Sequence, residues 1–156
     1  MSMCSPAPSD PHSWASSVAA RRRMLANRRI DTAPEVALRR ALHACGLRFR
    51  KDHRLDLPGR RVRPDIAFTR AKLAVFVDGC FWHRCPLHAS FPRANAAYWA
   101  SKLEATVERD GRTNAALIAA GWRVLRVWEH EPIGTAVVRI VAALDDRQRS
   151  VEPGST

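Results

Sequence analysis

The sequence predicts an α/β protein with a mixed β-sheet and helices on both faces. Residues 73–77 form an apolar run without alternation, which is typical of a central strand covered on both sides. A second apolar strand, 122–129, follows a long helical segment, and a helical crossover makes two strands parallel neighbours. A chain of 156 residues is long enough for one such core of five or six elements.

The first expected element is a helix that begins at Asp31 or Thr32, since either side chain can cap it. Pro34 and Glu35 suit its first turn, and Gly46 is expected to end it. Its apolar face repeats at helical spacing in Leu38, Ala41, Leu42 and Cys45. We expect this face to pack beneath the sheet.

Three strands are expected next, as a meander. The first two are residues 47–51 and 63–68, joined by a loop that ends in the turn Pro58-Gly59. A further turn leads into the apolar third strand, 73–77. The second and third strands should therefore lie side by side.

A long helix is expected from Asn95 to about Ala120, where Gly121 stops it, with Gly111 as a weak point. Its inner face is expected to carry Trp99, Leu103, Val107, Leu117 and Ile118. After the second apolar strand, a final helix, 135–146, covers one face of the sheet. The expected order of elements is α-β-β-β-α-β-α.

The domain organisation follows from composition. A single domain is expected at residues 19–147, between a disordered N-terminal tail, 1–18, and a polar C-terminal tail, 148–156. The domain opens with a basic segment, which is either a solvated charge run or an arm that becomes ordered on a nucleic-acid backbone. Its arginines are Arg21, Arg22, Arg23, Arg28 and Arg29.

The net charge of +11, supplied mainly by arginine, favours a polyanionic partner, most simply nucleic acid. No apolar run approaches the roughly 20 residues that span a bilayer, and the first residues lack the pattern of a signal peptide. We therefore expect a soluble cytoplasmic protein. In that compartment, cysteines close to histidines are better explained as metal ligands than as disulfides.

Polar chemistry is concentrated in residues 76–88, directly after the apolar strand, where ligands bind in open α/β sheets. Asp65 on the second strand, Asp78 at the end of the third, and Glu35 on the helix beneath would meet there. Such carboxylates suit a hard divalent cation such as Mg²⁺. Each carboxylate also has a purely structural explanation. Asp65 would be a turn residue after Pro64, Asp78 would belong to an Asp-Gly turn, and Glu35 would be a favourable charge in the first turn of a helix.

A second metal site is indicated in the same segment. Cys80, Cys85 and His88 have the C-x4-C-x2-H spacing of three soft ligands in one loop. A tetrahedral site needs a fourth ligand, and His130 is the candidate because parallel pairing brings its strand end beside Cys80. A closed Cys₂His₂ zinc site of this kind is structural and helps its loop to fold.

His83 lies inside this loop, five residues after Asp78. Phosphodiester hydrolysis needs a water made nucleophilic near neutral pH, and an imidazole close to a metal assists this. The alternative is that His83 is itself a zinc ligand. If His130 does not complete the tetrahedron, His53 or a water is the expected replacement.

Six blocks occur in order between residues 21 and 131. They are 31–35 (Asp-Thr-Ala-Pro-Glu), 63–65 (Arg-Pro-Asp), 76–83 (Phe-Val-Asp-Gly-Cys-Phe-Trp-His), 98–102 (Tyr-Trp-Ala-Ser-Lys), 107–110 (Val-Glu-Arg-Asp) and 121–129 (Gly-Trp-Arg-Val-Leu-Arg-Val-Trp-Glu). Together they resemble the very short patch repair (Vsr) endonucleases. The resemblance implies a fold like that of type II restriction endonucleases, with a PD-(D/E)xK core. It also implies a Mg²⁺-dependent nick immediately 5′ of the thymine in a T·G mismatch.

The resemblance also assigns roles to single residues. It makes Asp65 a Mg²⁺ ligand beside the main-chain carbonyl of Val77, and His83 the general base. Asp78 and Asp110 match family positions that hold metal-bound waters or a neighbouring imidazole. Glu35 matches the acidic helix residue near the site. Asp78 stands where some members carry His.

In the same family, aromatic residues enter the DNA stack beside the mismatch, and the matching positions here are Phe81, Trp82 and Trp99. Unstacking costs a few kcal/mol, and less at a mismatch, so such a wedge itself favours mispaired DNA. The implied partner is double-stranded DNA with a T·G mismatch, bound by a monomer at the nucleoid of a bacterial cytoplasm. Mismatch-repair initiation proteins are further candidate partners.

Two other functions remain open at the level of sequence. One is a zinc-stabilised nucleic-acid-binding module without catalysis, in which the carboxylates would be dispensable. The other is a nuclease of restriction type that acts on unmodified duplex. A nicking assay on a T·G duplex beside its paired control distinguishes all three.

Overall fold

The computed structural model describes residues 31–88 and 95–151. The two expected tails lie largely outside these residues, as does residue range 89–94. The basic arm lies wholly outside them, so its role stays a prediction. Its arginines are Arg21, Arg22, Arg23, Arg28 and Arg29.

A four-stranded mixed sheet forms the centre of the protein, in the order β1-β4-β5-β6. Strands β1 (Arg50–Lys51), β4 (Ile66–Phe68) and β5 (Leu73–Asp78) are antiparallel neighbours. Strand β6 (Arg123–Trp128) pairs with β5 in parallel. The predicted meander and the predicted parallel pair are both confirmed.

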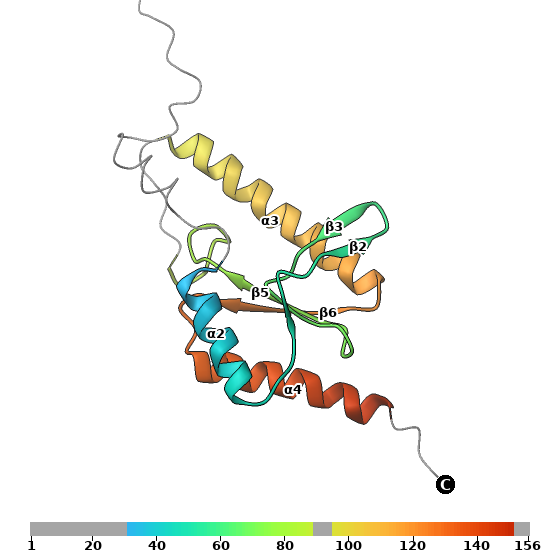
Figure 1. Cartoon of the computed structure of the whole chain (residues 1–156). Helices are drawn as coiled ribbons and strands as arrows, with labels where there is room; N and C mark the ends of the chain where they lie inside the picture. The colour runs from blue at the N-terminus through green and yellow to red at the C-terminus, as the bar shows by residue number, and fades with distance from the viewer. Residues whose placement is uncertain (1–30, 89–94, 152–156) are drawn as a thin grey trace, which may run out of the picture.

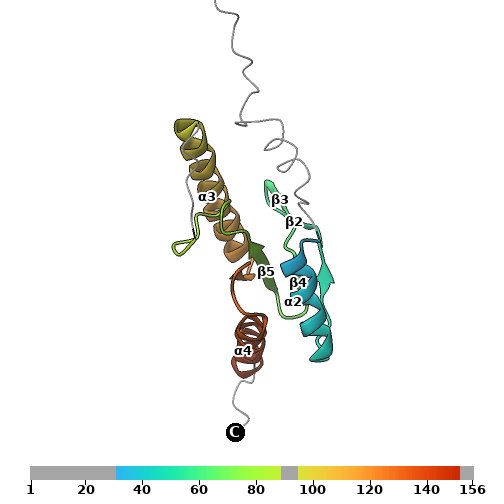
Figure 2. The ribbon, with the colours of Figure 1, turned by 90° about the vertical axis from the view of Figure 1, so that its left-hand side faces the viewer.

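Helices cover both faces of this sheet, as predicted. Figure 1 shows α3 (Ala96–Ala119) above the sheet, and α2 (Ala33–Ala44) and α4 (Ile133–Val151) below it; Figure 2 shows the same separation from the side. The core beneath the sheet contains Leu38, Leu42, Ile66, Phe68, Leu73, Val75, Val127, Ala136 and Ile140. A smaller core under α3 contains Leu55, Val62, Ala74 and Leu117.

The side chains of β5 alternate between these two cores. Leu73 and Val75 belong to the core of α2 and α4, whereas Ala74 and Phe76 belong to the core of α3. Asp78, two residues after Phe76, is therefore on the α3 face. This alternation decides which helix contributes to the site.

A separate two-stranded hairpin, β2 (Leu55–Leu57) and β3 (Arg60–Val62), occupies the segment that was predicted to be a loop. The predicted turn Pro58-Gly59 connects the strands, and Gly59 has a φ of +70°, which favours glycine. Within residues 31–88 and 95–151, the order of elements is therefore α-β-β-β-β-β-α-β-α. The predicted order lacked these two strands.

The hairpin is stabilised by tertiary contacts. Leu55 and Val62 pack against Leu117 of α3, and Arg60 donates from Nη1 to Thr113 Oγ1 at 3.0 Å. Strands of three residues with few apolar positions carry little periodicity, so the sequence pattern did not reveal them.

Helix α3 has the predicted extent and continues through Gly111. Two side chains predicted to face inward, Val107 and Ile118, are instead 45% and 63% exposed. The inner stripe runs through Asp110 and Asn114, which hydrogen-bond to residues of the site. The prediction was wrong at these positions because it assigned only apolar residues to the inner face.

The other two helices differ from prediction at their C-terminal ends. Helix α2 ends at Ala44, so Cys45 is an exposed cap residue and not part of the apolar face. Helix α4 begins at Ile133 and continues to Val151, beyond the predicted 135–146 and into the expected tail. Neither these helices nor α3, in the described part of the chain, is long and apolar enough to cross a membrane.

Candidate active site and metal centre

Asp65 directly precedes β4, next to the carboxyl end of β5. Its Oδ2 accepts a hydrogen bond from the Val77 N–H at 2.7 Å, and its carbonyl accepts from the Asp52 N–H at 3.2 Å. Its second carboxylate oxygen accepts no hydrogen bond from the described residues. The backbone therefore holds the Asp65 carboxylate in place and leaves one oxygen available.

The surroundings of Asp65 favour its protonated form. Burial, together with the negative charges of Glu35 and Asp78, raises its pKa to about 6, and the Val77 N–H opposes this shift. Three carboxylates thus share one end of the sheet without a cation among the described side chains close enough to neutralise Asp65. Such a site is electrostatically suited to a bound cation.

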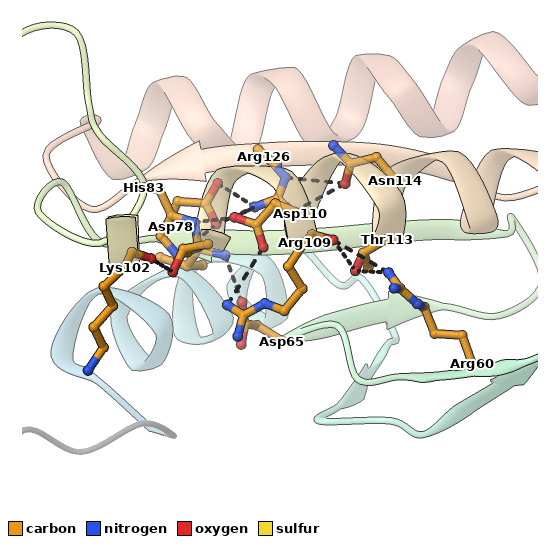
Figure 3. A network of polar contacts seen from close by, with 12 residues as sticks. Arg60, Asp65, Asp78, His83, Lys102, Arg109, Asp110, Thr113, Asn114 and Arg126 are labelled. Atoms are coloured by element: carbon orange, nitrogen blue, oxygen red, sulfur yellow. Dashed lines mark hydrogen bonds and ion pairs between the residues drawn. The ribbon is translucent and has the colours of Figure 1, made fainter. Parts of the chain in front are cut away.

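Asp78, at the end of β5, is only 4% exposed and is neutralised by Arg126 of β6. Arg126 Nη1 donates to both carboxylate oxygens, at 2.7 and 2.8 Å. On the other side of the guanidinium, Nε and Nη2 donate to Asn114 Oδ1 of α3 at 3.3 and 3.2 Å. This network joins two strands and a helix at the site (Figure 3).

His83 lies between two of the predicted acidic residues. Its Nδ1 is 2.5 Å from Asp110 Oδ2, and its Nε2 is 3.7 Å from Asp78 Oδ1. Because an ionised carboxylate only accepts, Nδ1 is the donor in the contact with Asp110. The structure therefore brings Asp78, His83 and Asp110 together, and Figure 3 shows them grouped with Arg126.

Sequence reasoning missed Arg126 and Asn114. The signal was present, because Arg126 interrupts the apolar residues 124–128 at a position that faces α3. Asp110 Oδ2 is also 3.5 Å from Arg126 Nη1, so one guanidinium contacts both carboxylates that flank His83. Arg126 thus fixes the spacing of the groups around the imidazole.

Glu35 occupies the first turn of α2 and is 5% exposed. Its carboxylate accepts the Asp31 N–H at 2.9 Å and the Thr32 hydroxyl at 2.7 Å. Thr32 is the N-cap residue, but the side chain that accepts a backbone N–H belongs to Glu35. Glu35 therefore stabilises the start of the helix as well as adding negative charge near Asp65.

The four predicted zinc ligands come together. One ligand atom from each of Cys80, Cys85, His88 and His130 lies within 4.8 Å of the others. The Sγ of Cys80 is 3.0 Å from His130 Nδ1, and the Sγ of Cys85 is 3.7 Å from the Nδ1 of both His88 and His130. His53, the predicted replacement, is not in this group.

This group fits a tetrahedral zinc ion. Bonds of about 2.0–2.3 Å place the ligand atoms of a zinc tetrahedron roughly 3.3–3.8 Å apart, close to the separations found here. Both thiols are buried and both imidazoles are at the surface. Glu129, which sequence reasoning missed, holds the loop from below: its Oε1 accepts the Cys80 N–H at 2.7 Å, and its own N–H donates to the Asp78 carbonyl at 3.0 Å.

An aromatic cluster lies beside the loop. Phe81 is 5.1 Å from Trp82 and 5.5 Å from Trp99, measured between ring centroids. Phe81 and Trp82 are half-buried, but Trp99 is 3% exposed. Trp99, predicted to enter the DNA stack, is thus positioned to support the other two rings, because it is covered by its own neighbours.

Sequence comparisons connect the chain to a family of known proteins. A family model described as DNA mismatch endonuclease Vsr matches residues 16–88. The type II nicking enzyme V.NaeI of Lentzea aerocolonigenes is 56% identical over 124 residues, 79% of this chain and 75% of the relative. V.XorIIP of Xanthomonas oryzae pv. oryzae is 45% identical over 119 residues, 74% of this chain and 84% of the relative. DNA mismatch endonuclease Vsr of Escherichia coli K12 is 41% identical over 101 residues, 64% of this chain and 62% of the relative.

The chain belongs to the Vsr family. The relatives are named as type II nicking enzymes and as a DNA mismatch endonuclease, and this Vsr-family protein is accordingly an endonuclease. The matched family model spans Asp65, Asp78 and His83. The resemblance identified from sequence blocks is thus confirmed at the level of the family.

The raised pKa of Asp65 predicts how the stability of this Vsr-family protein depends on pH. Because the pKa is about 6 in the folded chain and 3.8 for an unperturbed aspartate, the folded protein binds more protons between these values, and stability falls as pH rises. Asp65→Asn removes this loss. The free energy of unfolding of Asp65→Asn, relative to that of wild type, should therefore rise by about 2 kcal/mol between about pH 4.5 and 7.5.

Urea unfolding of wild-type and variant protein in a chelator, at both pH values, measures this difference. Asp56→Asn is the matched control, since that side chain is 63% exposed. A variant advantage that does not change with pH would contradict the raised pKa of this half-buried carboxylate.

Arg126 gives a second prediction. Arg126→Gln leaves the buried Asp78 charge unpaired, and we expect the free energy of unfolding to fall by about 3 kcal/mol. The double variant Asp78→Asn, Arg126→Gln should recover much of this loss, because no uncompensated charge remains. Arg112→Gln, which breaks an exposed pair with Glu108, should change stability by less than about 1 kcal/mol. Thermal unfolding of the four proteins measures the effect, and an equally unstable double variant would argue against the pair.

Proposed function

We propose that this protein is a Mg²⁺-dependent endonuclease that nicks one DNA strand immediately 5′ of the thymine in a T·G mismatch, as in very short patch repair. The observation that carries the proposal is the imidazole of His83, held at Nδ1 by Asp110 and placed at the strand end that also bears Asp65 and Asp78. The choice of mismatch and metal rests on the Vsr family resemblance.

His83 is the general base of the proposed reaction. In the reactive tautomer the Nδ1–H donates a hydrogen bond to Asp110 Oδ2, and Nε2 accepts a proton from the attacking water. The imidazolium that results lies 3.7 Å from Asp78 Oδ1, whose negative charge stabilises it. Arg126 holds the Asp78 carboxylate in position through two hydrogen bonds, and Asp110 fixes the orientation of the ring.

Asp65 and the main-chain carbonyl of Val77 are the proposed Mg²⁺ ligands. The fit rests on the half-buried Asp65 carboxylate, which has one oxygen without a hydrogen bond from the described residues and is repelled by Glu35 and Asp78. When bound, Mg²⁺ supplies charge neutralisation for the phosphodiester group and its leaving oxygen. Val77 contributes through its N–H as well, because that bond orients Asp65.

Zn²⁺ is the proposed structural ion of the group Cys80, Cys85, His88 and His130. Three of these ligands lie in the loop that also carries His83, so an ion there would limit the movement of the imidazole. The donor set is closed, with four protein ligands and no open position. Its proposed role is therefore stability of the loop and not chemistry.

Recognition of the mismatch is assigned to the aromatic rings of Phe81 and Trp82. They are half-buried over the ring of Trp99, which gives them a firm support for entry between bases. The arginine arm is proposed to contact phosphates. The proposed setting is a monomer at the bacterial nucleoid, with mismatch-repair initiation proteins as candidate partners.

A second candidate activity is tested by the same assay. Several relatives are named type II nicking enzymes, including V.NaeI and V.XorIIP. A nick on fully paired duplex would favour the restriction-type nuclease that the sequence left open. Binding of DNA with no nick on either duplex would favour the module without catalysis.

The central test uses Asp65→Asn and His83→Ala on a T·G duplex and its paired control, with and without Mg²⁺. Both variants should lose nicking by at least about a hundredfold, because general-base and metal-assisted steps each contribute on that order. Mismatch binding should stay within about tenfold of wild type. Wild-type nicking rates in either variant, or nicking by wild type in a chelator, would reject the proposed chemistry.

The zinc assignment is tested at His130. His130→Cys should keep one zinc per chain, because thiolate and imidazole are both normal zinc ligands, whereas His130→Ala should lose it. Loss of the ion should also reduce nicking by misplacing His83, although no catalytic group is removed. Metal analysis and nicking assays of both variants give the answer. Full zinc content and normal nicking in His130→Ala would exclude His130 as a ligand.

A further inference from the structure

A basic surface lies outside the active site, along the edge strand β1 and the facing part of α2. It contains two adjoining hollows. The first is lined by Arg48, Phe49, Arg50, Phe68, Thr69, Arg70 and Ala71. The second is lined by Val36, Arg39, Arg40, His43, Phe49 and Lys51. We call the exposed cations Arg40, Arg48, Arg50, Lys51 and Arg70 the basic track.

The track carries charge that the protein does not itself neutralise. Within the described residues, Arg48, Arg50 and Arg70 form no ion pair with a carboxylate, and Lys51 has only a 3.5 Å contact with Asp31. Other exposed arginines differ: Arg112 pairs with Glu108 at 3.3 Å and Arg139 with Glu131 at 2.6 Å. Unpaired guanidinium groups that share a hollow are available to an external anion.

The wall between the two hollows is Phe49, which contributes to both. Its ring is 4.5 Å from that of His43 and 5.8 Å from that of Phe68, measured between centroids. Packing on both sides keeps this wall in place. Two adjoining cationic hollows with a fixed separation suit a ligand with repeated negative charges better than a single small anion.

The track begins next to the active site. Lys51 pairs with Ile66 across the sheet, and Asp65 is the residue before Ile66. The Asp52 N–H donates to the Asp65 carbonyl at 3.2 Å. From Lys51 to Arg48 an extended chain covers about 10 Å, at roughly 3.3 Å per residue. That length corresponds to about three phosphates of one DNA strand, at roughly 3.4 Å per phosphate along the helix axis.

We propose that the basic track binds the phosphate backbone of duplex DNA that flanks the nick position. The proposal rests on the proposed endonuclease function, which places a DNA strand at Asp65, where the track starts. Backbone contacts of this kind position a duplex without reading its sequence. DNA is favoured over an acidic protein segment because the track is continuous with the catalytic carboxylates.

The test compares Arg48→Gln, Arg70→Gln with the matched double variant Arg112→Gln, Arg139→Gln. Both remove two exposed arginines, so the net charge is equal. Binding to a fully paired duplex is measured without Mg²⁺, at about 50 and 200 mM salt, so that neither nicking nor mismatch recognition contributes. A second duplex is truncated to the base pairs around the nick position.

Each phosphate contact contributes about 0.9 to the salt slope, so two lost contacts should reduce the salt-induced rise in Kd by about tenfold on the long duplex. The effect should be smaller on the truncated duplex and absent in the matched control. Equal salt slopes for the track variant and its control would overturn the proposal that the basic track binds DNA, and would leave an acidic protein segment as the alternative ligand. A wild-type protein that binds no paired duplex would also overturn the proposal. Track-dependent binding without any nick would instead reject only the endonuclease proposal.

Discussion

The buried ion pair between Asp78 and Arg126 is the interaction on which the site depends. A carboxylate that is 4% exposed is stable in its charged form only with a partner, and the guanidinium provides it from the neighbouring strand. The pair exists because β5 and β6 are parallel and place both side chains on the α3 face. The same guanidinium reaches Asn114 and Asp110, so the strand pairing also sets the distance to α3.

The loop after β5 is held at several points around His83. Glu129 accepts the Cys80 N–H at the start of the loop, and the Cys and His side chains converge farther along it. Asp110 binds the imidazole from α3. A short loop with little apolar surface gains its order from these polar contacts and from the metal ion that they suit. The candidate metal ligands and His83 therefore alternate along one loop, so that a change in the metal ligands also affects the position of His83.

Charge is divided unequally over the protein. The net charge is +11, yet carboxylates gather at the end of the sheet where β4 begins and β5 ends, and burial with mutual repulsion raises the pKa of Asp65 to about 6. Exposed arginines surround that end and continue along β1. A polyanion would be attracted to the surface as a whole, while the local negative charge selects a cation at the point of reaction. This division explains how a basic protein accommodates an acidic centre.

The sequence by itself determined the sheet, the helices on both faces, the parallel pair and the six blocks of the Vsr family, because long apolar runs and motif spacing are local signals. It also indicated the four Cys and His side chains, since three of them share one loop. Tertiary structure alone decided the β2–β3 hairpin and the roles of Arg126, Asn114 and Glu129. These features depend on which side chains face each other across strands and α3, and periodicity in one segment does not contain that information.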